Sequence, residues 1–80
     1  MITYDELINI VEDALEVPAG TIANGDESMW ADKWDSLGHL SILIKLDLNL
    51  DGRCSNIADL ANAYRIDTIS EILRRENLMK

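Results

Sequence analysis

Eighty residues are enough for one small domain spanning 1–80, but they leave little room for the deep cleft of a typical enzyme. Nearly half of the residues (48%) are apolar and few are aromatic, which indicates a globular chain rather than a disordered one. The net charge of −8 argues against nucleic acid or an anionic membrane surface as a partner, because both are bound through Lys and Arg.

The excess of negative charge lies entirely before Ser36. Residues 1–35 contain nine acidic residues and one basic residue, whereas residues 36–80 contain six of each. Cys54 is the only cysteine, so no internal disulfide can form, and a lone thiol suits a reducing compartment. The first residues lack the basic flank and apolar run of a signal peptide, and no stretch is apolar enough to span a bilayer. We therefore expect a cytoplasmic protein.

The first predicted helix begins near the N-terminus. Thr3 and Glu6 have the spacing of a capping box, which predicts a helix from Thr3 to about Leu15. Apolar residues at helical spacing form one stripe, which we expect to face the core. They are Leu7, Val11, Ala14 and Leu15, with Ile8 at the edge. The acids on the other side, Glu12, Asp13 and Glu16, are expected to form a solvated face.

A long connection follows, from about Val17 to Trp34. Pro18 and Gly20 end the first helix and begin this connection. A loop of this length must be held by its own apolar side chains. Trp30 and Trp34 are expected to cover the core, and the alternative is that one of them contacts a ligand or partner through its amphipathic ring.

The central helix is predicted from Ser36 to about Asn49. Asp35 and Ser36 are both good N-cap residues, and apolar residues follow at spacings of three and four. The alternation of apolar and polar residues over 44–50 would by itself indicate a strand. Leu, Lys and Asp are poor strand formers, however, and no partner strand is visible elsewhere. The segment is apolar on nearly all sides, which is typical of a central helix.

Two further helices complete a predicted all-α bundle of three main helices and one short helix. The spacing of Asn56 and Asp59 predicts a cap for a short helix that ends near Tyr64, and Asp67 or Thr68 is expected to cap the last helix. The residues expected to face the core from these two helices are Ile57, Leu60, Ala61, Ile69, Ile72 and Leu73. Arg74 and Arg75 fall in the last turn, where cations complement the helix dipole.

Several kinds of chemistry are not supported by the residues. Ser36 and His39 are neighbours on one helix, but no acid is placed to orient the imidazole, which argues against serine hydrolysis, and His39 is expected at the surface. One His and one Cys do not make a zinc site. Asp26, Glu27 and the acids of 47–52 hint weakly at calcium, without the spacing of an EF-hand.

The stretch Trp34-Asp35-Ser36-Leu37-Gly38-His39-Leu40 resembles the attachment site of acyl carrier proteins. In that family an Asp-Ser-Leu tripeptide opens the second helix of an antiparallel bundle with three main helices and one short helix. The position near mid-chain, the predicted helix start and the acidic composition agree with the resemblance. A short motif of this kind is also a common helix cap, and capping alone is the alternative interpretation.

The resemblance implies a cofactor and a set of partners. Ser36 would carry 4′-phosphopantetheine, transferred from coenzyme A by a phosphopantetheinyl transferase, with Asp35 and Leu37 completing the motif. The protein would then be a monomeric carrier without enzymatic activity that holds an acyl group as a thioester for enzymes of fatty acid, polyketide or related biosynthesis. An aminoacyl carrier, such as a D-alanyl carrier, is the nearest alternative, and a non-covalent helical interaction module is the alternative from another class.

Two surfaces for cargo and partners follow from the central helix. It is nearly apolar all round, so a cavity bordered by residues such as Leu43 and Leu46 is expected to shelter an acyl chain. Family members typically dock through acids on this helix, whereas here Lys45 and Asp47 are its only charged residues. The expected partner-binding strip is instead apolar: Leu37, Leu40, Ile44 and Leu48. The alternative is that these four residues are packed beneath the Trp30–Trp34 loop.

Overall fold

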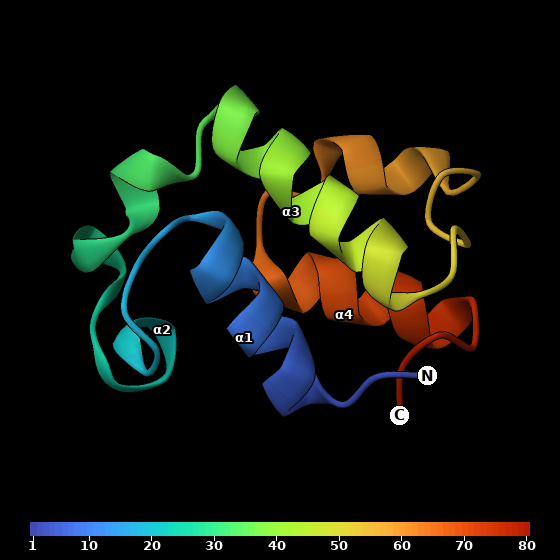
Figure 1. Cartoon of the computed structure of the whole chain (residues 1–80), viewed down its shortest axis with the longest axis horizontal. Coiled ribbons are helices and arrows are strands. Elements are labelled where there is room, and N and C mark those ends of the chain that lie inside the picture. Colours follow the sequence, from blue (N-terminus) through green and yellow to red (C-terminus); the bar gives the residue numbers. More distant parts are fainter.

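The computed structural model describes all residues, 1–80, and it confirms an all-α protein. In Figure 1, α3 runs alongside α1 and lies at a slant to α4, and the two chain ends meet beside the end of α4. None of the helices has the length and apolar character that a membrane crossing requires. The α-helices are α1 (Tyr4–Ala14), α2 (Thr21–Asn24), α3 (Ser36–Asn49) and α4 (Ile66–Arg75). The 3-10 helices are η1 (Glu27–Met29), η2 (Ala31–Lys33) and η3 (Ala58–Asn62).

Helix α1 begins at the predicted capping box. The Thr3 hydroxyl accepts the Glu6 N–H at 3.2 Å, and the Glu6 carboxylate accepts the Thr3 N–H at 3.0 Å. The predicted apolar stripe is buried. The prediction that Glu12 lies on a solvated face is wrong, because this side chain is only 2% exposed. Its carboxylate accepts the Ile22 N–H at 2.9 Å and so ties α2 to α1.

Helices α1 and α3 pack antiparallel. Lys45 on α3 forms an ion pair with Asp13 on α1 at 2.9 Å, while Gly38 near the start of α3 approaches Leu15, just past the end of α1. The side of α3 that carries Gly38 and Lys45 therefore faces α1. The ion pair is largely exposed, so it contributes to the register of the two helices more than to stability.

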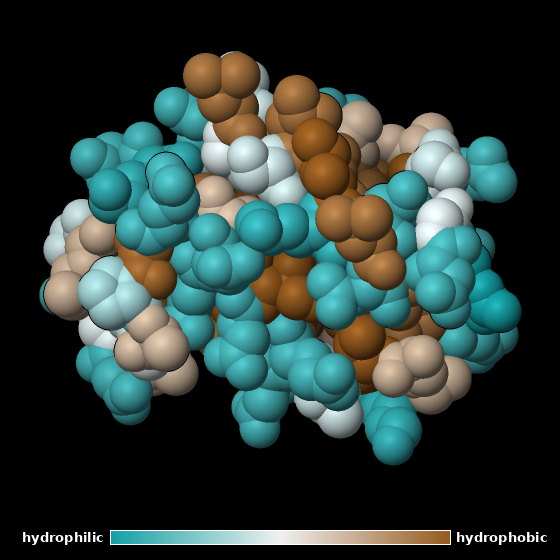
Figure 2. Space-filling model, in the orientation of Figure 1, coloured by the Kyte–Doolittle hydropathy of each residue, from teal (hydrophilic) through white to brown (hydrophobic).

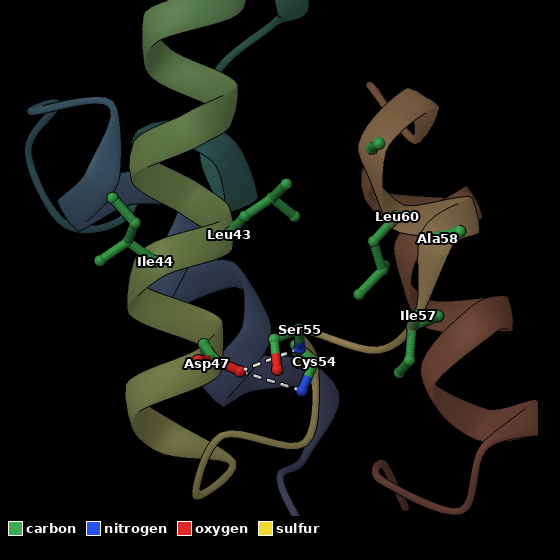
Figure 3. A pocket seen from close by; sticks show the side chains of 9 residues that line it. Leu43, Ile44, Asp47, Cys54, Ser55, Ile57, Ala58 and Leu60 are labelled. Carbon is green, nitrogen blue, oxygen red and sulfur yellow. Dashed lines mark hydrogen bonds between the residues drawn. The ribbon is translucent and has the colours of Figure 1, made fainter.

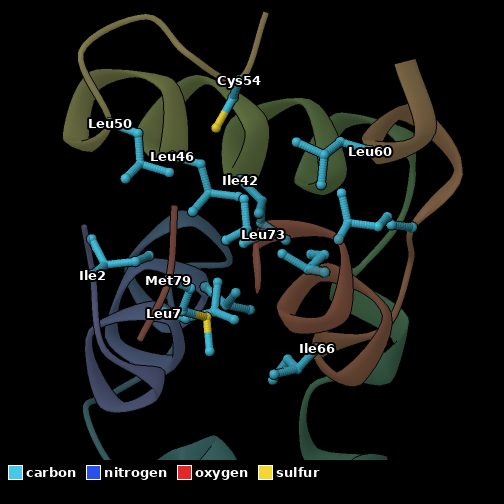
Figure 4. Packing of buried hydrophobic residues seen from close by; sticks show 14 of the residues in the cluster. Ile2, Leu7, Ile42, Leu46, Leu50, Cys54, Leu60, Ile66, Leu73 and Met79 are labelled. Carbon is cyan, nitrogen blue, oxygen red and sulfur yellow. The ribbon is translucent and has the colours of Figure 1, made fainter. Parts of the chain in front are cut away.

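The core lies between α1, α3 and α4 (Figure 4). Its fully buried side chains come from all three helices and from η3: Leu7, Val11, Ile42, Leu46, Leu60, Ile69 and Leu73. Ile2 extends this core, because its backbone pairs with Leu78 and Lys80 beyond the end of α4. The chain ends are thus held together by backbone hydrogen bonds, although only an isolated bridge forms.

The predicted caps of the second half are wrong. The N-cap residue of α4 is Arg65, two residues before the predicted Asp67 and three before the alternative Thr68, and no side chain caps the helix. The expected short α-helix is the 3-10 helix η3, which begins after Ile57 without a side-chain cap. Its Leu60 is buried as expected, but Ala61 is exposed. The inward face of α4 is confirmed, and Arg75 in its last turn binds Asp59 of η3 at 2.9 Å.

Candidate functional site

The candidate site is the exposed start of α3. Asp35 is the N-cap residue, and its carboxylate accepts the Gly38 N–H at 2.8 Å. Ser36 is therefore the first residue of the helix, as predicted. Its hydroxyl is exposed and makes no hydrogen bond, and the backbone amides of Ser36 and Leu37 are also without hydrogen-bond partners. A free hydroxyl thus stands at the positive end of the α3 dipole, where negative charge is stabilised.

A cluster of aromatic side chains packs against this helix start. His39 is buried (3% exposed), so its expected surface position is wrong. The Trp34 indole N–H donates to Nδ1 of His39 at 3.0 Å, which leaves the Nε2–H of a neutral imidazole to donate to the Leu60 carbonyl at 2.8 Å. The Tyr64 ring stacks on His39 with centroids 4.0 Å apart. His39 consequently connects α3 to η3 through Leu60, and to Trp34, the residue before Asp35.

The two tryptophans behave differently. Trp34 is buried and covers the core as expected. Trp30 packs against it with ring centroids 6.0 Å apart and is half-buried. The Trp30 indole nitrogen is buried without a hydrogen-bond partner, and nothing in the structure explains why this donor is left unpaired.

Gly38 fits a place where a side chain would not. A Cβ atom there would lie 2.3 Å from the Lys33 carbonyl oxygen and 2.9 Å from Leu15 Cδ2. The close contact fixes the loop before Ser36 against the first turn of α3. Glycine is thus required by packing, since its backbone conformation in the helix is ordinary.

Gly38→Ala is expected to lower the free energy of unfolding by about 2 kcal/mol, because the added methyl overlaps a backbone oxygen that cannot move alone. Helix propensity alone predicts the opposite sign, a gain of about 1 kcal/mol. Urea unfolding followed by circular dichroism measures the difference, with Ser41→Ala on the same helix as a control. Equal or greater stability of the Gly38→Ala variant would contradict this packing.

The apolar strip, defined as Leu37, Leu40, Ile44 and Leu48, faces outward. Leu37 and Leu48 are 74% and 77% exposed, so the loop containing Trp30 and Trp34 does not cover the strip. Figure 2 shows apolar side chains gathered along α3. Exposed leucines at one helical spacing are a surface that water solvates poorly. The strip begins directly beside Ser36.

A pocket of about 290 Å³ opens between α3 and the segment from Cys54 to Ala61 (Figure 3). Leu43 lines it as predicted, whereas Leu46 is completely buried in the core and does not. The remaining lining residues were not predicted: Ile44, Asp47, Cys54, Ser55, Ile57, Ala58, Leu60 and Ala61. Ile44 belongs both to the pocket and to the strip, so the two apolar surfaces are continuous.

Asp47 holds the loop that closes one end of this pocket. Its Oδ1 atom accepts the backbone N–H groups of Cys54 and Ser55 at 3.0 and 3.1 Å. Burial, reinforced by the negative charge of Asp47, raises the pKa of the Cys54 thiol to about 11. Cys54 is thus protonated at neutral pH and is a poor nucleophile. No group of three or more His, Cys, Asp or Glu is arranged to hold a metal ion.

Comparisons with protein-family models, with curated proteins and with solved structures find no match to this chain. The function is therefore inferred from the residues and geometry of the site. The structure brings together Asp35, Ser36 and Leu37 at one helix start and places the strip and the pocket on the same helix. Sequence reasoning missed His39 and Asp47, although His39 shares the helical spacing of the buried Ile42 and Leu46.

Proposed function

We propose that this protein is a carrier that holds an acyl intermediate as a thioester on a 4′-phosphopantetheine arm attached to Ser36. The observation that carries the proposal is the free Ser36 hydroxyl at the capped start of α3, within the Asp35-Ser36-Leu37 motif. The arm supplies the thiol that holds the cargo. The chain supplies the attachment oxygen, a rigid helix start and adjoining apolar surfaces, and the cytoplasm is the proposed compartment.

Attachment uses the Ser36 hydroxyl as the nucleophile. Its Oγ forms a bond to the β-phosphorus of coenzyme A, while the phosphoanhydride bond breaks and adenosine 3′,5′-bisphosphate leaves. The hydroxyl proton passes to a base of the transferase, because no base of this chain reaches Ser36. The adjacent Asp35 carboxylate binds the Gly38 N–H and makes no hydrogen bond with the Ser36 hydroxyl. This chain is therefore a substrate in the proposed reaction and not its catalyst.

The pocket supports an acyl cargo over a purely non-covalent module. Most of its lining is apolar, and it opens beside the helix that carries Ser36. Its volume lies just below the usual range for small-molecule sites, which favours a short or medium chain over a long fatty chain. Fatty acid or polyketide intermediates and aminoacyl groups remain the two cargo classes.

Incubation with coenzyme A and a broad-specificity phosphopantetheinyl transferase is expected to add one phosphopantetheine, detected by intact mass. Ser36→Ala is expected to abolish the addition completely, because the attacking oxygen is removed while the Asp35 cap remains. Ser41→Ala on the same helix is the matched control and should be modified like the wild type. An unchanged wild-type mass, or a modified Ser36→Ala variant, would defeat the proposal.

Partner enzymes are proposed to dock on the apolar strip. Ile44→Asp is expected to raise the KM of the transferase for this protein about tenfold, because a charge would be buried without a partner. The wild-type KM should vary little between low and moderate salt, since apolar contacts are not screened. Asn9→Asp, which adds the same charge to an exposed position on α1, should leave the KM unchanged. A steep salt dependence with an unaffected Ile44→Asp variant would instead indicate docking on the acidic first half.

A further inference from the structure

The pocket between α3 and η3 contains one charged side chain. Of its nine lining residues, seven are apolar, and the other two are Asp47 and Ser55. Both polar side chains lie at the same end, beside Cys54, as Figure 3 shows. Helix α3 rises by about 16 Å between Ser36 and Asp47, so this polar end is the one far from the attachment oxygen. A chain tethered at Ser36 therefore meets Leu43 before it meets Asp47.

Asp47 has one oxygen that its structural role does not use. Both loop amides bind Oδ1, and Oδ2 makes neither a hydrogen bond nor an ion pair. The Ser55 hydroxyl donates its proton to the Gly52 carbonyl at 3.0 Å, so it too can only accept further hydrogen bonds. Every free side-chain oxygen at this end of the pocket is thus an acceptor.

The charge on Asp47 makes one end of the pocket electrostatically negative. It contributes to the raised pKa of Cys54, whose side chain lines the same end. No Lys or Arg forms an ion pair with Asp47: Lys45 on the same helix is paired with Asp13, and Arg53 in the neighbouring loop makes no ion pair. An apolar pocket that ends in an uncompensated carboxylate favours a ligand with an apolar stem and a positively charged or hydrogen-bond-donating tip.

We infer that Asp47 is a specificity-determining residue, which selects an acyl cargo of short or medium length whose distal end carries a hydrogen-bond donor, most strongly an ammonium group. The inference rests on the proposed attachment at Ser36. It names the chemistry of the cargo, which the carrier function alone leaves open.

The test compares two tethered cargos of equal length. Coenzyme A analogues with an amide-linked 6-aminohexanoyl or heptanoyl chain are loaded by the transferase, so that the cargo cannot hydrolyse. Pocket occupancy is measured from the amide chemical shifts of Leu43, Ile57 and Ala58. The amino-tipped chain is expected to occupy the pocket about ten times more than the methyl-tipped chain, the equivalent of one hydrogen bond to a charged group.

Asp47→Asn is the matched variant. Its amide oxygen can still accept the Cys54 and Ser55 N–H groups, while the free acceptor becomes a donor. The tenfold preference should disappear in this variant, and circular dichroism should show an unchanged fold. Equal occupancy by both chains in the wild type, or a preference that survives Asp47→Asn, would overturn the inference and leave Asp47 as a loop anchor only. Failure of coenzyme A and of both analogues to attach at Ser36 would instead overturn the carrier function, and this inference with it.

Discussion

Leu46→Ala is expected to lower the free energy of unfolding by about 3 kcal/mol. The Leu46 side chain is completely buried, and it packs between the helices at the centre of the core (Figure 4). Removing three carbon atoms loses their transfer free energy and leaves a cavity that a core of this density fills only in part. In a domain of this size, such a loss is a large fraction of the whole stability.

Leu48 provides a control two residues away on the same helix. Its side chain is 77% exposed, so Leu48→Ala is expected to change the free energy of unfolding by less than about 0.5 kcal/mol. Urea unfolding of both variants under the same conditions measures the difference. Similar losses for the two variants would mean that α3 is rotated about its axis relative to the arrangement described, and the apolar strip would then be part of the core.

His39→Leu is expected to lower the free energy of unfolding by about 3 kcal/mol, although it replaces a polar residue in the interior by an apolar one. The substitution leaves the Trp34 indole N–H and the Leu60 carbonyl without partners at a buried position. Each unsatisfied buried group costs about 1–3 kcal/mol. Stacking of Tyr64 against the imidazole is also lost.

Two conservative variants separate the hydrogen bonds of His39. Asn has an acceptor near the place of Nδ1, and Gln has a donor near the place of Nε2, so each retains one partner. Both variants should lose less stability than His39→Leu, and Trp34→Phe should add little further loss in the His39→Leu background. Full stability of His39→Leu would show that the two hydrogen bonds do not contribute to folding.

The sequence predicted those helix starts that local side chains determine. Thr3 and Asp35 accept amides only three residues ahead, so their capping signals are complete within one turn and both helices begin where expected. Helices α4 and η3 begin without any side-chain cap, so the capping predicted from Asn56 with Asp59, and from Asp67 or Thr68, is wrong. The alternating segment 44–50 lies almost entirely in α3, where Leu46 and Leu50 are buried in the core, and no strand exists to pair with it.

The errors concern polar side chains with distant partners. Glu12 binds an amide ten residues away, and His39 binds a carbonyl twenty-one residues away. Helical periodicity gives the face on which such a residue lies, but it cannot supply the partner that makes burial favourable. Most of the pocket lining was not predicted for the same reason, because one wall comes from the distant segment that begins at Cys54. The position of Ser36, in contrast, could be predicted, because it depends only on the cap at the start of its own helix.

The positions of Trp30 and Trp34 make intrinsic tryptophan fluorescence a probe of the region around Ser36. They are the only two tryptophans in the chain, and both lie within six residues of Ser36. Trp34 is in stacking distance of His39, and Trp30 lies against Trp34. Emission from the indoles therefore reports almost exclusively on this end of the molecule. Events at the start of α3 can be followed in the unmodified protein, without a fluorescent label that would itself disturb so small a domain.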